Sequence, residues 1–470
     1  MGPICQHRHQ LQPANHNLSG DDLLLTMEPV LRRYAGLSVP RYTSYPTAAE
    51  FSPAVGPDDK ARWLERLPAR EPVSLYIHVP YCREICHYCG CTTKMVIRDH
   101  VLANYRRLLK AEIELTGEHL RRPLRVARLS WGGGTPSLLQ AEGLNAVIDD
   151  LAKHFALEPG FEHAIELDPR GVTPELARGL ARIGVNRVSL GIQDLDPAVQ
   201  GAIGRVQPLA TVEAAFAALR DAGLGRINAD LIYGLPKQSV ASVTETARRI
   251  AHLGPDRIAC YGYAHLPQHK RNQRLIDAGA LPGPSERFAQ ARALAQRFVE
   301  AGYQPIGIDH FARPEDALAV AAREGRLSRN FQGYTDDRST SLIGFGASAI
   351  SCVADGFAQN FPNPEAYAFA LGQGQLPVVR GHRTTEDDRT RGAIIRQLMC
   401  TFRVDLSAFA TAGSFSDELA LLRPMIADGL VVQNGLDISM TPLGRPFVRV
   451  AAAVFDVFRH EVSHGFSAAV

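Results

Sequence analysis

Four cysteines stand within ten residues of the sequence, with the spacing Cys82-x3-Cys86-x2-Cys89-x-Cys91. Cysteine spacing sets iron–sulfur ligation, and three thiolates on one short loop can hold three corners of an iron–sulfur cube while the fourth iron keeps no protein ligand. A metal position left open in this way is typical of catalytic sites. A zinc knot with Cys91 or a nearby histidine as fourth ligand is the alternative, although no second ligand pair of the structural zinc type follows.

The elements that must position these cysteines alternate in a regular order. Apolar, β-rich runs precede helical patterns six times, at 73–79, 126–131, 163–167, 187–190, 227–232 and 257–263. Six strand–helix units without hairpin signals predict parallel strands joined by right-handed crossovers. A closed eightfold barrel would need two more units, so we expect an α/β fold built on a partial (β/α)6 barrel that is open on one side.

The helices of this barrel are expected at 100–116, 137–155, from 173, near 196, at 239–252 and at 285–301. Barrel active sites lie at the carboxyl ends of the strands. The cysteine loop, a Gly-Gly-Gly-Thr-Pro segment and three polar side chains fall at that end of their strands: Glu166, Gln193 and Asp230. We therefore expect these segments to meet on one rim.

Each rim segment has a chemical and a structural interpretation. The glycine triplet lets backbone approach a ligand without obstruction, or it is only a flexible turn. Glu166 can meet a ligand amine or ribose hydroxyls, whereas acids near strand ends also cap helices. Arg205 can reach a carboxylate through its planar fork, or it is a solvated surface arginine.

Composition limits the partners. The chain has 51 basic and 49 acidic residues, so its overall charge is nearly balanced. Its net charge therefore does not indicate binding to nucleic acid or to a membrane. The first residues lack a signal-peptide core, and no apolar window is long enough for a membrane span. Four of the eight cysteines are scattered, which indicates a reducing compartment. We expect a cytoplasmic protein.

The cysteine motif and the Gly-Gly-Gly-Thr-Pro segment together resemble the radical S-adenosylmethionine (SAM) superfamily. Longer stretches resemble one family within it, the oxygen-independent coproporphyrinogen III oxidases of heme biosynthesis: 40–47 (PRYTSYPT), the additional Cys91, 230–236, 263–267, 309–314 and 330–335. The resemblance runs from about residue 40 into the C-terminal region.

The resemblance implies roles for individual residues. Cys82, Cys86 and Cys89 would ligate one 4Fe–4S cluster, whose unique iron would chelate SAM. The positions that match SAM contacts are Tyr76, Tyr88, Gly133, Gly134, Thr135, Glu166, Gln193, Arg205, Asp230 and Ala264, and those near a second SAM are Gln332 and Ile350. Cys91 matches a further position of catalytic interest that is not a cluster ligand, with a buried inert thiol as the alternative.

The implied reaction is anaerobic oxidative decarboxylation of two propionates of coproporphyrinogen III to vinyl groups, giving protoporphyrinogen IX. One electron from the cluster would cleave SAM to a 5′-deoxyadenosyl radical, which takes a hydrogen from the β-carbon of a propionate. The electron would come from a donor protein such as a flavodoxin or ferredoxin, and the enzyme is expected to act as a monomer. Candidate propionate anchors, which could equally form internal ion pairs, are Arg41, Arg170, Arg313 and Arg329.

We expect four parts in the chain. Residues 1–70 would form an N-terminal arm or lid, 71–310 the barrel, 311–376 an extension lining the active site, and 377–470 a small, mainly helical C-terminal domain. That domain is expected to hold helices at 385–401, 416–428 and 446–460 and a strand pair near 430–440, with no basic stripe for nucleic acid. The rival function is that of a radical-SAM-related heme-binding chaperone without oxidase turnover.

Overall fold

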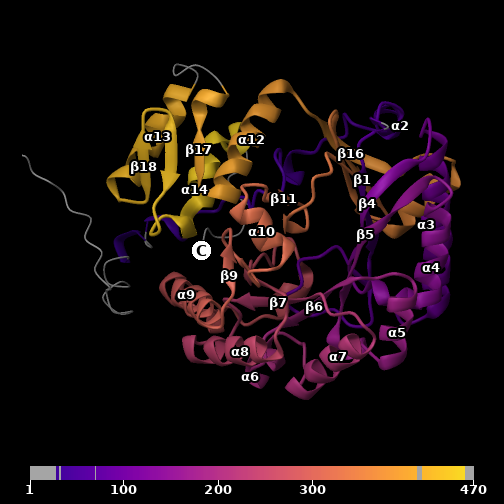
Figure 1. The fold of residues 1–470 in the computed structure, drawn as a ribbon, viewed down its shortest axis with the longest axis horizontal. Helices are drawn as coiled ribbons and strands as arrows, with labels where there is room; N and C mark the ends of the chain where they lie inside the picture. The colour runs from indigo at the N-terminus through magenta and orange to yellow at the C-terminus, as the bar shows by residue number, and fades with distance from the viewer. Residues whose placement is uncertain (1–27, 31–32, 69, 410–414, 461–470) are drawn as a thin grey trace, which may run out of the picture.

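A computed structural model describes residues 28–30, 33–68, 70–409 and 415–460. Its centre is a sheet of twelve strands in the order β16-β15-β14-β13-β1-β4-β5-β6-β7-β8-β10-β9. In Figure 1 the helices α3, α4, α5, α7 and α8 follow one another along the outer side of this sheet, and the C-terminal elements α12, α13, α14, β17 and β18 lie together beyond its edge.

The six expected strands are present and pair in parallel, one after another. They are β1 (Val73–Val79), β4 (Leu124–Gly133), β5 (Phe155–Leu167), β6 (Arg187–Gln193), β7 (Ile227–Tyr233) and β8 (Arg257–Gly262). The predicted α/β partial barrel is confirmed. The strand face that packs on the helices is apolar, whereas alternate residues such as Ser130, Glu166 and Asp230 line the cavity on the other face.

Seven helices cross between these strands or follow the last: α3 (Asp99–Glu118), α4 (Gln140–Leu151), α5 (Pro174–Arg182), α6 (Pro197–Ala202), α7 (Leu209–Asp221), α8 (Val240–Leu253) and α9 (Pro284–Glu300). Thr173 caps α5 through its side chain, which accepts from Leu176 N, as its Thr-Pro-Glu sequence predicts. The prediction of helix to residue 155 is wrong, because Phe155 begins the long strand β5. Helix α7 (Leu209–Asp221) was not expected.

The sheet extends past the six strands on both sides. A seventh parallel strand, β13 (Ser341–Phe345), pairs with β1 and continues through the antiparallel β14 (Ile350–Val353), β15 (Gly356–Asn360) and β16 (Val378–Arg383). At the other edge, β10 (His310–Ala312) and β9 (Gln304–Ile306) are antiparallel. No pairing joins β9 to β16 in the described residues, so the sheet stays open.

Shorter elements complete the main body. Helices α10 (Ala317–Arg323) and α11 (Pro364–Gly372) lie between strands of the extension, and two small pairs are formed by β2 (Tyr81–Cys82) with β3 (Lys94–Met95) and β11 (Ser328–Asn330) with β12 (Gly333–Thr335). Helix α2 (Pro57–Glu65) is tied to the sheet edge, where Asp59 pairs with Arg383 at 3.0 Å.

The C-terminal unit has its own apolar core. It contains α12 (Glu386–Thr401), β17 (Arg403–Asp405), α13 (Ser416–Ala427), β18 (Val431–Asn434), β19 (Asp437–Met440) and α14 (Val448–Ala452). The expected strand pair is confirmed with β17 as an unexpected third strand, but the last helix is shorter than 446–460 and is followed by 3-10 turns. Because β16 belongs to the main sheet, we propose that this unit begins after Arg383 and not at 377.

The N-terminal segment links the two cores. Tyr34 and Tyr42 are buried in the C-terminal core, and Arg41 between them lines the central cavity. The expected lid covers residues 1–70, of which 1–27, 31–32 and 69 lie outside the described residues, so its lid function stays a prediction.

Candidate active site

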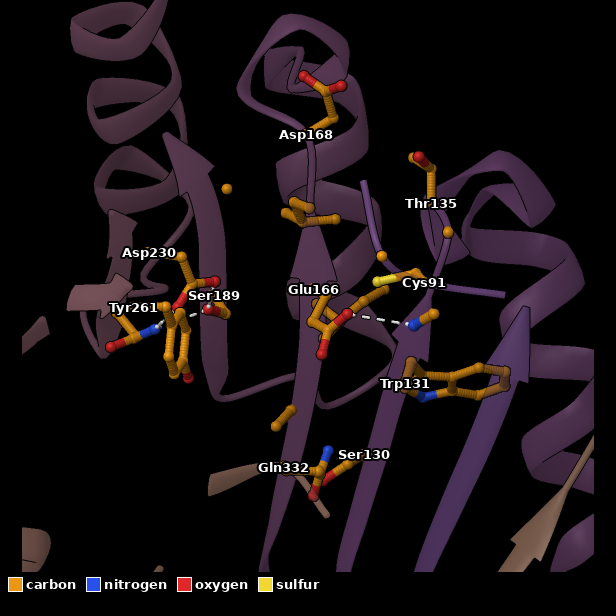
Figure 2. A pocket seen from close by; sticks show the side chains of 18 of the residues that line it. Cys91, Ser130, Trp131, Thr135, Glu166, Asp168, Ser189, Asp230, Tyr261 and Gln332 are labelled. Carbon is orange, nitrogen blue, oxygen red and sulfur yellow. Dashed lines mark hydrogen bonds between the residues drawn. The ribbon is translucent and has the colours of Figure 1, made fainter. Parts of the chain in front are cut away.

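A cavity of about 550 Å³ opens at the carboxyl ends of the parallel strands. Its walls include the cysteine loop, the glycine triplet, Glu166, Gln193 and Asp230, so the predicted meeting on one rim is confirmed. Figure 2 shows Asp230, Ser189 and Tyr261 on one side, Cys91 and Thr135 on the other, and Glu166 between them. Its size suits a ligand that is buried over most of its surface.

The cysteine loop is held by contacts that the sequence analysis missed. Asn272 Nδ2 donates to three carbonyl oxygens of the loop, those of Cys86, His87 and Cys89, at 3.0, 3.1 and 2.9 Å. The neighbouring Gln273 donates to Tyr88 O at 2.9 Å. Both belong to the 3-10 helix η4 (Arg271–Leu275), which follows β8 in the chain. They stand among other polar residues in the sequence, and no spacing pattern marks these two amides as contacts of the cysteine loop.

The sulfur atoms of Cys82, Cys86 and Cys89 have different hydrogen-bond partners. Thr135 Oγ1 donates to Cys82 Sγ at 3.4 Å, and Arg205 Nη1 donates to Cys86 Sγ at 3.4 Å. A hydrogen bond from Cys91 lowers the pKa of Cys89 to about 6. Cys91 is exposed and lines the cavity, a position that favours a role in the site over that of a buried inert thiol. Its catalytic role stays a proposal.

The glycine triplet provides a cradle that a side chain would fill. A Cβ on Gly134 would lie 2.4 Å from the carbonyl oxygen of Tyr81, and one on Gly133 would lie 2.6 Å from the ring of His78. Gly133 also has φ of +109°, a conformation that favours glycine. Close packing against β1 and the cysteine loop, and not flexibility, therefore explains glycine at these positions.

Two carboxyl groups face the cavity from β5 and β7, the strands on either side of β6. Glu166 Oε2 accepts from Gly133 N at 3.1 Å, and Asp230 accepts from Ser189 Oγ at 2.6 Å and Asn228 Nδ2 at 2.7 Å. Burial, and then the charge of Asp230, raise the pKa of Glu166 to about 7. Burial also raises the pKa of Asp230. A cationic ligand group placed here would relieve both carboxylates.

Arg205 is a buried positioning group and not a solvated surface arginine. Its guanidinium donates to Asp168 at 3.1 Å and to Gly191 O at 2.6 Å, and its Nε has no hydrogen-bond partner in the described region. Asp168 is further held by Arg170, which also pairs with Glu84 at 2.9 Å. Arg170 is thus engaged in internal ion pairs, and we do not propose it as a substrate anchor.

Two other candidate arginines, Arg41 and Arg313, lie in different cavities. Arg41 lines the cavity, donates to Gly262 O at 2.5 Å and lies 5.7 Å from the ring centre of Tyr261. Arg313 instead lines a second cavity with Asp256 and stacks on Tyr303, at the opposite, amino-terminal ends of the strands. Substrate contact by Arg313 does not fit this position, and we do not propose it.

Of the remaining predicted site residues, four line the cavity and two do not. Tyr88, Ala264 and Gln332 line the cavity, and Figure 2 places Gln332 at the end away from Asp168. Gln193 also lines it, with φ of +68°, a strained conformation that is common at functional sites. Tyr76 and Ile350 are not among the lining residues. Tyr76 lies directly behind the rim, where its hydroxyl is 3.0 Å from His78 Nδ1.

The residues present fit an iron–sulfur cluster with SAM. Three thiols line one cavity beside the cradle of Gly133 and Gly134, and the orphaned Nε of Arg205 lies near them. Within the described residues, no three His, Cys, Asp or Glu side chains are grouped so that they could hold a single metal ion.

Comparisons with known proteins agree with this geometry. The family model of the radical SAM superfamily matches residues 76–250, and that of the HemN C-terminal domain matches 384–447. An oxygen-independent coproporphyrinogen III oxidase of Bradyrhizobium diazoefficiens is 45% identical, over 90% of this chain and 95% of that protein. The chain belongs to the family of oxygen-independent coproporphyrinogen III oxidases. The relative from Escherichia coli is 38% identical over 90% of this chain and 93% of its own.

A solved structure of this family gives the same fold. It is that of the Escherichia coli coproporphyrinogen III oxidase, described as a radical SAM enzyme, with a TM-score of 0.85 over 89% of this chain and 97% of that one. Membership of the superfamily implies a 4Fe–4S cluster and SAM. The heme-chaperone alternative finds no support among the relatives. No helix in the described ranges has the length and apolarity needed to cross a membrane.

Proposed function

We propose that this protein catalyses the oxygen-independent oxidative decarboxylation of two propionates of coproporphyrinogen III, giving the two vinyl groups of protoporphyrinogen IX. The observation that carries the proposal is the single cavity that three cysteines of the x3/x2 motif share with a side-chain-free glycine cradle and two buried carboxyl groups. The names and the 38–45% identity of the relatives support it.

Cys82, Cys86 and Cys89 are proposed to hold the 4Fe–4S cluster. When bound, the cluster and SAM supply the 5′-deoxyadenosyl radical that removes a hydrogen atom from a propionate side chain. Arg205 hydrogen-bonds Cys86 Sγ and so places a fixed positive charge beside a thiolate ligand. A hydrogen bond to a ligating sulfur stabilises the negative charge of a reduced centre.

The residues of the rim are proposed to orient SAM. Glu166 can accept from the methionyl amine, and the backbone at Gly133 to Thr135 can approach the ligand closely. Gln193 ends β6 and Asp230 lies in the middle of β7, and both line the cavity within reach of ribose hydroxyls. Tyr88 and Ala264 complete the wall, and Tyr76 supports the rim from behind.

A second SAM molecule is proposed on the basis of Gln332. This amide reaches the same cavity from the turn between β11 and β12, far from Asp168 in Figure 2. Ile350 begins β14 and is not a lining residue. Gln332 is therefore the better position for testing the second molecule.

Arg41 and Arg329 are proposed as propionate anchors. The guanidinium of Arg329 lies 4.3 Å from the ring centre of Tyr334, a residue of the cavity wall. Its buried Nε and Nη1 have no hydrogen-bond partner within the described part of the chain. Unpaired buried donors are costly, and a carboxylate would satisfy them through a bidentate contact.

The cellular setting is also part of the proposal. The seven cysteines within the described residues are free thiols, as expected in a reducing compartment such as the cytoplasm. We propose a monomer that receives single electrons from a flavodoxin or a ferredoxin.

The test is anaerobic incubation of the reconstituted protein with coproporphyrinogen III, SAM and a chemical reductant, followed by mass analysis of the tetrapyrrole. Loss of two carbon dioxide units is expected, and Cys82→Ala should abolish it together with the bound iron. Arg41→Ala and Arg329→Ala should raise the KM for substrate at unchanged iron content, whereas Arg313→Ala serves as the control. SAM cleavage without any change in substrate mass would refute the proposal.

A further inference from the structure

The outer side of the cysteine loop is covered by one short element. Helix η4 lies directly on the loop, because Asn272 and Gln273 bind four consecutive carbonyl groups, those of residues 86–89. Lys270, just before the helix, is 3.4 Å from Cys91 O. A protein that approaches the loop on this side would therefore touch η4.

The solvent face of η4 is positively charged. Side chains three apart eclipse one another in a 3-10 helix, so Arg271 and Arg274 project from the same face, and both are exposed. No carboxylate in the described ranges forms an ion pair with either of them. The nearby Asp277 is engaged in capping the turn that follows. Lys270, which reaches the loop just before this helix, adds a third cation without a paired acid in the described residues.

Apolar side chains flank the same loop. Among the ten large hydrophobic side chains that are exposed in the described residues, four lie on the segments around it: Met95 (60% exposed), Ile97 (75%), Val206 (64%) and Leu275 (66%). Met95 pairs with Cys82 in the β2–β3 ladder, and Val206 follows the arginine that contacts Cys86. These four side chains add exposed apolar surface to the segments beside the cations, and exposed apolar surface is used in protein contacts.

We propose that η4 and the flanking apolar residues form the docking surface for an acidic, flavodoxin-type electron carrier. This inference rests on the proposed function, which requires single electrons. The cations complement an acidic partner and would steer its approach, and the apolar residues match the exposed apolar edge of a flavin ring. On each encounter the carrier loses one electron and the cluster gains one, with no bond made or broken. Small, transient interfaces are usual for such transfer.

The test compares two electron sources on the reconstituted holoenzyme. The double variant Arg271→Glu/Arg274→Glu should lower the rate with limiting reduced flavodoxin about tenfold at low ionic strength and leave the dithionite-driven rate unchanged. The wild-type rate with flavodoxin should fall as salt is added, and that of the variant should not. The matched control is Arg121→Glu/Arg122→Glu, the same charge change on exposed residues between α3 and β4, at the other ends of the strands.

A direct binding measurement tests the docking surface without catalytic turnover. Titration of holoenzyme with oxidised flavodoxin should show weaker affinity for the η4 variant than for the wild type and the control. Equal affinities and equal flavodoxin-driven rates would overturn the docking surface, and so would a selective loss with ferredoxin alone. Failure of the wild type to decarboxylate substrate with dithionite would refute the proposed function instead, and the binding result would be unaffected.

Discussion

Binding of SAM is expected to depend on pH through Glu166. Burial and the charge of Asp230 raise the pKa of this carboxyl to about 7 in the ligand-free protein. SAM carries a permanent positive charge on its sulfonium, and its methionyl amine donates hydrogen bonds, so bound SAM favours the ionised form of Glu166. Binding must then release the proton that the carboxyl holds below its pKa, and affinity should rise with pH until Glu166 is already ionised.

The size of the effect follows from that pKa. The ionised fraction of Glu166 is about 0.09 at pH 6 and about 0.9 at pH 8, so the apparent affinity should increase about tenfold between them. Equilibrium binding to anaerobic, reconstituted protein between pH 5.5 and 8.5 measures it. In Glu166→Gln the dependence should disappear. In Asp230→Asn the midpoint should move to lower pH, because one of the causes of the raised pKa is removed.

Three outcomes would refute this reasoning: affinity that does not change between pH 6 and 8, a pH dependence that persists in Glu166→Gln, or affinity that falls as pH rises. The last would mean that the protonated carboxyl donates to the ligand. The midpoint in Asp230→Asn separates an electrostatic effect of Asp230 from its own ligand contacts, since lost contacts would weaken binding equally at every pH.

Three further changes test how the site is held. Asn272→Ala removes three hydrogen bonds to the cysteine loop and should lower iron and sulfide content after reconstitution, since each unsatisfied buried acceptor costs about 1–3 kcal/mol. Gly134→Ala places a Cβ 2.4 Å from Tyr81 O and should abolish SAM binding in an equilibrium assay and destabilise the fold by about 1–3 kcal/mol. Lys60→Met leaves the buried Glu112, 3.5 Å away, without its counter-ion and should cost about 3–5 kcal/mol in thermal or denaturant unfolding.

Each of these changes has a matched control. Asn145→Ala alters a half-buried asparagine of α4, away from the cysteine loop, and should leave iron content unchanged. Gly143→Ala introduces a Cβ no closer than 3.4 Å to its neighbours and should be tolerated. The double variant Lys60→Met/Glu112→Gln should recover part of the lost stability. Normal iron in Asn272→Ala, tight SAM binding in Gly134→Ala, or no recovery in the double variant would contradict the respective argument.

Features that depend on local spacing could be predicted from the amino-acid sequence. The cysteine motif, the glycine triplet and the alternation of strands and helices are read within short windows, because ligand spacing and backbone periodicity are local properties. The order of strand–helix units also placed Glu166 and Asp230 on one rim, because parallel strands bring their carboxyl ends together.

The partner that each long side chain meets became visible only in the folded chain. Arg41, Arg170 and Arg313 are equivalent in sequence terms, yet one lines the cavity, one is held by two acids and one lies at the other end of the strands. Asn272 holds the cysteine loop from 183 residues away in the chain. Such contacts depend on distances between segments that become neighbours only in the folded chain, and no local pattern encodes them.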